Sequence, residues 1–127
     1  MIGIFLITHG TLGESLIQCA SHVLNRRPEQ IVQLGVSAQD DPLDLMPAAV
    51  EMLKWVDSGD GVVVLTDVFG ATPANMAVKL LQPGRVAGIA GVNVPMLLRM
   101  LTYRDRDLET LIRRGISGGC EGVLQLK

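Results

Sequence analysis

A titratable ring and a carboxylate each stand just after an apolar stretch of the chain. His9 follows the apolar residues 2–7 after a single threonine and directly precedes Gly10. Asp67 follows the stretch 62–66 and leads into a Gly/Ala/Thr/Pro turn at residues 70–73. In an α/β fold, polar residues at the carboxyl ends of strands line the crevice where ligands bind. Taken alone, His9 could equally be a capping or turn histidine bonded to nearby backbone.

Together, the two side chains could form a nucleophile. In a doubly wound sheet the first and third strands are commonly neighbours, so their carboxyl ends would face each other. Asp67 could then accept a hydrogen bond from one ring nitrogen of His9, which fixes the tautomer and leaves the other nitrogen with a free lone pair. The carboxylate would also stabilise the positive ring that forms when this lone pair bonds to an electrophile.

The turn after Asp67 favours a phosphoryl group as that electrophile. Gly70, Ala71 and Thr72 lead into the amino end of a helix, where unpaired backbone N–H groups and the helix dipole attract anions. Thr72 adds a hydroxyl donor, and Gly10 lets the backbone approach closely beside His9. We therefore assign phosphate binding to Gly10, Gly70, Ala71 and Thr72. A simple helix-capping motif is the alternative for the turn.

The elements that must position these residues follow an alternating pattern. Short β-branched runs predict strands near residues 2–8, 31–36, 61–66 and 85–90, with a late short strand near 122–126. Helical periods lie between them: residues 12–24, a segment capped by Asp41-Pro42 whose helix either starts at Pro47 or is kinked there, a helix from Pro73 with Thr72 as its cap, and stretches near 95–103 and 107–114. Residues 116–119 resemble a flexible link. The pattern predicts an α/β fold with a doubly wound, mostly parallel sheet in the order 2-1-3-4, helices on both faces and a C-terminal antiparallel strand.

Composition narrows the class of protein. The 127 residues fit one domain, 1–127, and the 48% apolar content supplies a core that must be aliphatic, since there are only two Phe, one Tyr and one Trp. A net charge of -2 without a basic run argues against nucleic-acid binding. The absence of a secretory signal and of an apolar run near the ~20 residues of a membrane span predicts a cytoplasmic protein without membrane insertion. Without a Walker loop, a dinucleotide turn or an acidic cluster, we expect no cofactor and no metal.

Three segments carry a resemblance to a known family. They are residues 5–10 (FLITHG), 64–73 (VLTDVFGATP) and 90–97 (AGVNVPML), in order along nearly the whole chain. They are similar to those of the mannose-family IIA domain, a component of the bacterial phosphoenolpyruvate-dependent sugar phosphotransferase system. The family's D-x-x-G-[GA]-[ST]-P turn matches residues 67–73. Ala71 stands where the family often has glycine, and Thr72 where it often has serine; both keep a backbone donor and a hydroxyl.

The resemblance implies a phosphotransferase with a phosphohistidine intermediate. His9 matches the histidine that takes a phosphoryl group from the carrier HPr and passes it to a IIB domain, and Asp67 matches the aspartate that orients it. By the same resemblance, Nε2 would carry the phosphoryl group while Asp67 holds Nδ1–H. Family members also form homodimers that exchange the C-terminal strand. The residues alone leave this open, because the same strand could fold back onto its own sheet.

Other functions remain open at this point. A flavodoxin-like module could bind a mononucleotide phosphate with Thr8, Gly10 and Thr11, although the chain is poor in the aromatic residues that line a flavin site. A receiver domain phosphorylated on Asp67 would need paired acids after the first strand, where Thr8 and His9 stand instead. The phosphorelay itself could serve sugar uptake, a regulatory system or a dihydroxyacetone kinase.

Overall fold

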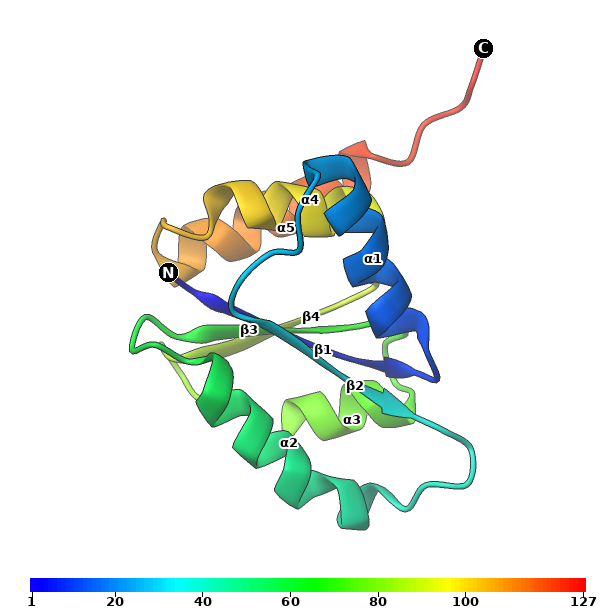
Figure 1. The fold of residues 1–127 in the computed structure, drawn as a ribbon, viewed down its shortest axis with the longest axis vertical. Helices are drawn as coiled ribbons and strands as arrows, with labels where there is room; N and C mark the ends of the chain where they lie inside the picture. The colour runs from blue at the N-terminus through cyan, green and yellow to red at the C-terminus, as the bar shows by residue number, and fades with distance from the viewer.

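A four-stranded parallel sheet forms the centre of the computed structural model, which describes residues 1–127. Its strands are β1 (Gly3–His9), β2 (Ile31–Val36), β3 (Val62–Thr66) and β4 (Val86–Ala90), in the spatial order β2-β1-β3-β4 (Figure 1). The predicted order and the four strand ranges are confirmed to within one residue. In the register of the sheet, His9 pairs with Val36 on β2, and Ile7 pairs with Thr66 on β3.

Helices cover both faces of this sheet. Helices α1 (Leu12–Leu24), α4 (Val94–Tyr103) and α5 (Leu108–Glu121) lie on one face, and α2 (Pro42–Val56) and α3 (Thr72–Val78) lie on the other (Figure 1). Side chains of β1 alternate between the two resulting cores: Ile4 and Leu6 face the first, and Phe5 and Ile7 the second. Because both faces are buried, the central strands read as continuous apolar runs, and the polar residues that end them stand out.

The two helices on the second face begin where the chain turns away from the sheet. Helix α2 starts at Pro42, with Asp41 accepting a hydrogen bond from the Leu43 N–H at 3.0 Å, and runs through Pro47. A start at Pro47 is therefore wrong. Helix α3 starts at Thr72, so Ala71 occupies the cap position and no side chain caps the helix. The prediction that Thr72 is the cap is wrong by one residue, and its hydroxyl is not used for capping.

Helix α5 is longer than the sequence predicts. The segment 116–119, expected to be a flexible link, lies inside the helix, because its glycines allow close packing against α4. A Cβ placed on Gly118 would lie 2.6 Å from the Cβ of Arg99, and one on Gly122, just after the helix, 2.3 Å from the Cβ of Pro95. No larger residue fits at either position without moving α4, so these glycines serve helix contact rather than chain flexibility.

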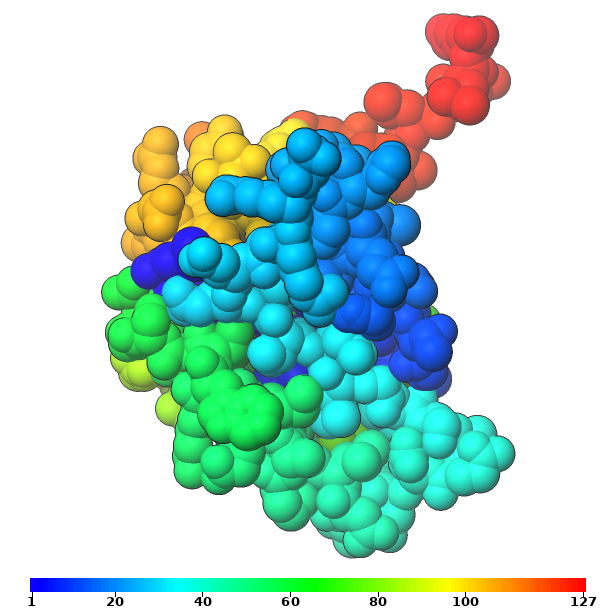
Figure 2. Space-filling model, in the orientation of Figure 1, coloured from blue at the N-terminus to red at the C-terminus, as the bar shows by residue number.

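The C-terminal residues 123–127 form no strand. They leave the end of α5 and project away from the body of the molecule (Figures 1 and 2), with Val123 and Leu124 at least three-quarters exposed (75% and 77%). The antiparallel strand predicted near 122–126 is thus absent from the single chain, and the outer edge of β4 has no neighbouring strand. None of the five helices is both long and apolar enough to span a bilayer.

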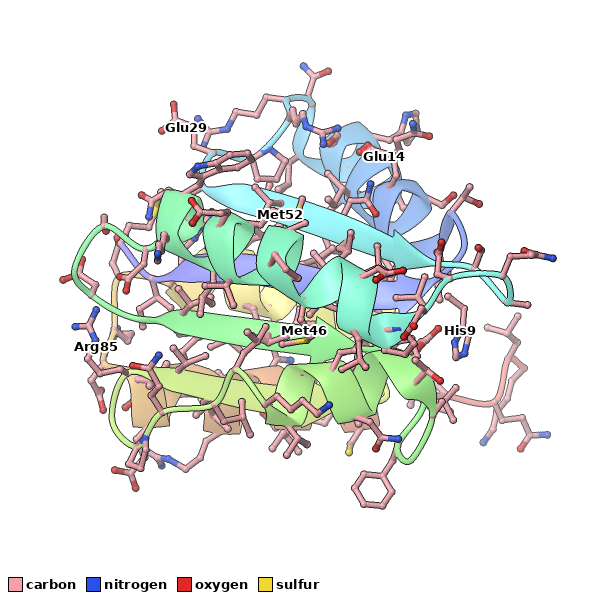
Figure 3. All side chains as sticks on the ribbon, turned by 90° about the horizontal axis from the view of Figure 1, so that it is seen from below. His9, Glu14, Glu29, Met46, Met52 and Arg85 are labelled. Carbon is pink, nitrogen blue, oxygen red and sulfur yellow. The ribbon has the colours of Figure 1, made fainter.

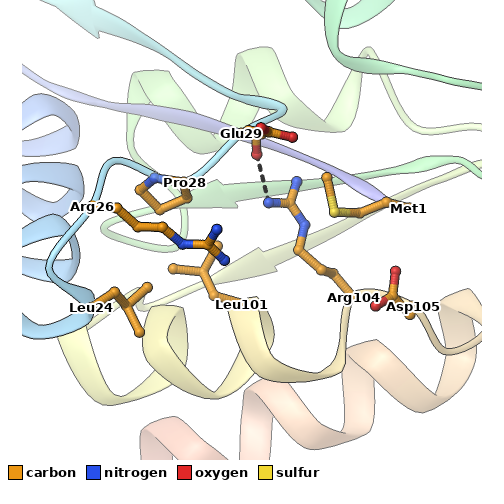
Figure 4. A pocket seen from close by; sticks show the side chains of 8 residues that line it. All are labelled: Met1, Leu24, Arg26, Pro28, Glu29, Leu101, Arg104 and Asp105. Atoms are coloured by element: carbon orange, nitrogen blue, oxygen red, sulfur yellow. Dashed lines mark hydrogen bonds between the residues drawn. The ribbon is translucent and has the colours of Figure 1, made fainter.

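The amino edge of the sheet is tied together by one buried arginine. The Arg104 guanidinium donates to the carbonyl oxygens of Ile2 (3.0 and 3.1 Å), Glu29 (2.6 Å) and Gln30 (2.7 Å). Figure 4 shows the bond to Glu29. Burial lowers the pKa of this guanidinium. Arg104 joins the loop after α4 to the starts of β1 and β2, so it fixes the end of the sheet away from His9.

Candidate functional site

His9 and Asp67 meet at the carboxyl edge of the sheet, as the sequence predicts. Asp67 Oδ2 lies 2.8 Å from His9 Nδ1 and accepts a second hydrogen bond, 3.0 Å long, from the His9 backbone N–H. Asp67 Oδ1 accepts the N–H of Val68 at 3.0 Å. An ionised carboxylate can only accept, so Nδ1 must carry the proton in this contact. In the neutral ring, Nε2 is then the nitrogen with the free lone pair.

The two side chains differ in their access to solvent. The ring of His9 is 53% exposed, whereas the carboxylate of Asp67 is only 9% exposed. Burial raises the pKa of the Asp67 carboxyl, but the hydrogen bonds from the backbone and ring of His9 outweigh this effect and hold the pKa below its ordinary value. Asp67 therefore stays ionised at neutral pH and keeps the proton of the ring on Nδ1.

A cavity of about 250 Å³ opens beside His9. Figure 3 shows His9 at this edge of the sheet, at the opposite end from Arg85. Thr72 lines the cavity, and the backbone N–H groups of Thr72 and Ala74 have no hydrogen-bond partner in the chain. Uncommitted N–H groups at a helix start are suited to anionic oxygen atoms. Thr72 thus lies where a group attached to His9 could reach it.

The other predicted phosphate-binding residues lie nearby but outside the cavity lining. The N–H of Gly10 donates to the Val36 carbonyl at 2.9 Å, so this amide is already used. Gly10 (φ +53°) and Gly70 (φ +85°) adopt backbone conformations that favour glycine, and both shape the turns that flank the site. Ala71 donates its N–H to the Val68 carbonyl at 3.3 Å. These residues set the path of the backbone around His9.

The sequence reasoning missed the loop between β2 and α2. Ser37, Ala38 and Asp40 line the cavity together with His9 and Thr72. The loop is held by two hydrogen bonds, from the Ser37 N–H to Asp40 Oδ2 at 2.8 Å and from the Asp40 N–H to the Ser37 carbonyl at 3.1 Å. The only signal for it was positional, since a strand that neighbours β1 must end beside His9.

Charge around the cavity is one-sided. No lysine or arginine lines it, and Asp40 contributes a carboxylate. No group of three or more His, Cys, Asp or Glu side chains gathers anywhere in the structure. Contacts to an anion in this cavity must therefore come from hydroxyl and amide groups of this chain. The arrangement as a whole presents an oriented imidazole with a free Nε2, beside neutral hydrogen-bond donors.

Comparisons with known proteins find relatives over nearly the whole chain. The PTS system mannose-specific EIIAB component of Escherichia coli (strain K12) is 31% identical over 129 aligned residues, which cover 99% of this chain and 40% of that relative. The chain thus spans about two-fifths of that relative's length. The transcriptional regulatory protein LevR of Bacillus subtilis (strain 168) is 24% identical over 114 residues, 87% of this chain and 12% of LevR.

A solved structure shares the fold over nearly the whole chain. The phosphotransferase system component EIIA from Streptococcus agalactiae superposes with a TM-score of 0.87 at 22% identity, covering 98% of this chain and 97% of that one. A family model described as the PTS system fructose IIA component, EIIA-man, matches residues 3–113. Because this match covers most of the chain, including both strand ends that form the site, the chain belongs to the mannose-type IIA family of the phosphotransferase system, as the three sequence segments predict.

Proposed function

We propose that residues 1–127 act as one IIA domain, a phosphotransferase that carries a phosphoryl group on His9, receives it from HPr and passes it to a IIB domain. The observation that carries this proposal is the 2.8 Å contact between Asp67 Oδ2 and His9 Nδ1, which leaves Nε2 free. The ring is half exposed, so two partner proteins can reach it in turn. Membership of the IIA family supports the choice of partners.

The transfer step needs no proton to leave the site. The Nε2 lone pair of His9 attacks the phosphorus, and the bond from phosphorus to the donor's ring nitrogen breaks with its electron pair returning to the donor. The phosphorylated ring of His9 keeps Nδ1–H and becomes positively charged, so the carboxylate of Asp67 stabilises it. Transfer between two ring nitrogens is nearly balanced in free energy, and the chain's task is to align the groups and hold the charge.

The turn at residues 70–72 supplies contacts to the phosphoryl oxygen atoms in this proposal. Thr72 offers its hydroxyl and its free N–H. Gly70 and Ala71 set the backbone that leads to it, and Gly10, which directly follows His9, carries no side chain. Val68 (55% exposed) and Phe69 (87% exposed) lie in the same loop, and they give a docking protein an apolar surface next to the reacting ring.

The test is phosphorylation by HPr charged from phosphoenolpyruvate. The wild-type chain should gain one phosphoryl group that is labile in acid and stable in base, with a ³¹P NMR signal of phosphohistidine substituted at Nε2. His9→Ala should gain none. His22→Ala is the matched control, because His22 is exposed on α1 and lies outside the cavity. Normal labelling of His9→Ala would refute the proposal, and a base-labile product would point to an aspartyl phosphate instead.

We also propose that the chain forms a homodimer in which the C-terminal residues 122–126 pair with the free edge of the partner's β4. The tail is apolar and exposed, with Leu126 at 93% exposure. Beside β4 lies a largely apolar groove of about 350 Å³ lined by Phe69, Val78 and Leu81 among others. Thr66 also lines this groove, and its buried hydroxyl has no hydrogen-bond partner. Adding a strand would cover an edge that proteins rarely leave open.

Deletion of residues 122–127 tests this arrangement. Light scattering after size-exclusion chromatography should give a dimer for the full chain and a monomer for the truncated one. Substituting Lys127→Ala is the control, since it changes the tail without removing its apolar residues. A monomeric full-length chain, or a dimer that survives the deletion, would contradict the exchange.

A regulatory phosphorelay is the second candidate for the purpose of the transfer. It is favoured by the likeness to LevR, a transcriptional regulatory protein, over 87% of this chain. Sugar uptake predicts that the phosphorylated chain passes its group to a IIB domain of the mannose type. Rapid loss of label to a purified IIB domain would support uptake, and retention of label in its presence would favour the regulatory role.

A further inference from the structure

The loop between β2 and α2 brings a second hydroxyl to the cavity beside His9. Ser37 directly follows Val36, the residue whose Cα pairs with His9 across the parallel strands. Ser37 lines the same cavity as Thr72, which belongs to the start of α3. The cavity is thus bounded by the end of β1 and by the segments that follow β2 and β3, and each of these two segments contributes a hydroxyl.

The hydroxyl of Ser37 is available, while its backbone is fixed. Ser37 is exposed and its side chain makes no hydrogen bond within the chain. Its N–H donates to Asp40 Oδ2 at 2.8 Å, and its carbonyl accepts the Asp40 N–H at 3.1 Å. This reciprocal pair holds the loop in one turn. A hydroxyl on a fixed backbone can meet a ligand with little further loss of conformational freedom.

The charge of the cavity makes such a neutral donor important. A phosphoryl group brings about two negative charges. No lysine or arginine lines the cavity, and Asp40 adds a further negative charge. Hydroxyl and amide donors of this chain must therefore stabilise the phosphoryl oxygen atoms. A hydrogen bond to a charged oxygen is stronger than one between neutral groups.

We infer that the Ser37 hydroxyl donates a hydrogen bond to the phosphoryl group on His9, and that Asp40 is a positioning residue that acts through the Ser37 N–H. The inference rests on the proposed phosphorylation of His9 and deepens it. Ser37 contacts the transferred group, whereas Asp40 keeps the loop in place with the oxygen that accepts the Ser37 N–H. An asparagine at position 40 would keep that acceptor and remove the charge.

Chemical phosphorylation with potassium phosphoramidate tests the contact without a partner protein. The phosphorus–nitrogen bond of phosphoramidate breaks, ammonia leaves, and the His9 Nε2–phosphorus bond forms. Ser37→Ala should lower the rate of labelling about tenfold, which is the loss expected for one hydrogen bond to a charged oxygen at an open site. Ser37→Thr should restore the rate. Ser15→Ala is the matched control, since Ser15 is an exposed serine of α1 outside the cavity lining.

The two Asp40 variants separate positioning from charge. Asp40→Ala should lower the rate as Ser37→Ala does, whereas Asp40→Asn should keep it or raise it, because the clamp stays and the repulsion goes. The melting temperature should change little in the serine variants, and the ³¹P shift of the phosphorylated chain should move in Ser37→Ala but not in Ser15→Ala.

The outcomes distinguish this inference from the proposed function. If the wild-type chain is labelled on His9 and Ser37→Ala is labelled at the same rate with an unchanged ³¹P shift, the Ser37 contact is wrong while the phosphohistidine stands. If neither phospho-HPr nor phosphoramidate labels His9 in the wild-type chain, the proposed function itself is wrong.

Discussion

Replacing Asp67 with asparagine separates the charge of this residue from its shape. Asp67 Oδ2 accepts two N–H groups of His9, at 2.8 and 3.0 Å, while Oδ1 accepts the N–H of Val68. Asparagine has one oxygen, so one of its two neighbours must face an NH₂ group. If the NH₂ faces the ring, Nδ1 becomes the acceptor and the proton moves to Nε2, which then has no lone pair for attack.

The size of the effect follows from the contact that is lost. A hydrogen bond to a charged group contributes about 1.5 to 3 kcal/mol, and the half-exposed ring of His9 favours the lower part of this range because water screens the charge. A loss of about 2 kcal/mol corresponds to about 30-fold in rate. We expect at least this decrease in phosphorylation by phospho-HPr for Asp67→Asn, and more where the tautomer changes.

Two measurements check this reasoning. Transfer rates from phospho-HPr give the decrease, and ¹⁵N NMR of the imidazole reports which nitrogen carries the proton. Asp44→Asn is the control, because Asp44 is an exposed carboxylate in the first turn of α2 and makes no side-chain hydrogen bond. A wild-type rate for Asp67→Asn together with an Nδ1-protonated ring would show that the carboxylate neither orients nor stabilises the ring.

Three further changes test the scaffold. Arg104→Met should cost about 3 kcal/mol in urea unfolding, because the buried carbonyl group of Ile2 and the part-buried ones of Glu29 and Gln30 lose their donor. Gly35→Ala should cost about 2 kcal/mol and shift the His9 NMR signals, since the new Cβ would lie within 2.1 Å of the Gly10 carbonyl oxygen. Burial raises the pKa of the Asp57 carboxyl. Hydrogen bonds from the Gly59 and Gly61 N–H groups and the charge of Arg85 outweigh this effect, so the pKa lies below its ordinary value. The ionised carboxylate therefore stabilises the fold above about pH 4, and this stabilisation is lost as the pH falls through the lower pKa of the folded state. Asp57→Asn should be less stable than the wild-type chain by about 1 kcal/mol at pH 7 in urea unfolding, and the difference should vanish in strong acid.

The pairing of His9 with Asp67 could be predicted because it depends on few assumptions. Strands β1 and β3 are buried on both faces, so their sequences are apolar up to Thr8 and Thr66, and the titratable residues that follow these threonines mark the edge of the sheet. The parallel order then brings the two edges together. Only the adjacency of β1 and β3 had to be supplied by fold rules, and the register of Ile7 with Thr66 agrees with them.

The end of the chain could not be read in the same way. Gly118 and Gly119 look like a linker by local propensity, since glycine weakens an isolated helix. In the structure, packing against α4 overrides that propensity, because only glycine permits the close approach of α5 to Arg99 and Met96. The residues beyond α5 have strand-like apolar character but no edge of their own sheet beside them.

The loop of Ser37 and Asp40 was missed for a different reason. Serine and aspartate are ordinary turn residues, and nothing in their order distinguishes a turn beside His9 from any other turn. Their position depends on which strand neighbours β1 on its second side and on the register that aligns Val36 with His9. Such information is tertiary, so a chemically plain loop becomes part of a site only when the sheet is assembled.

The unequal exposure of His9 and Asp67 suits the carrier role that we propose. A group that must be reached by a donor and later by an acceptor has to stand at the surface, and His9 is half exposed. The group that orients it gains from burial, because a desolvated carboxylate interacts more strongly with the ring and is not replaced by water. Asp67 meets this need by lying behind the ring and accepting the His9 backbone N–H as well. An exposed ring on a buried carboxylate would thus let the histidine keep one tautomer while the proposed donor and acceptor proteins exchange.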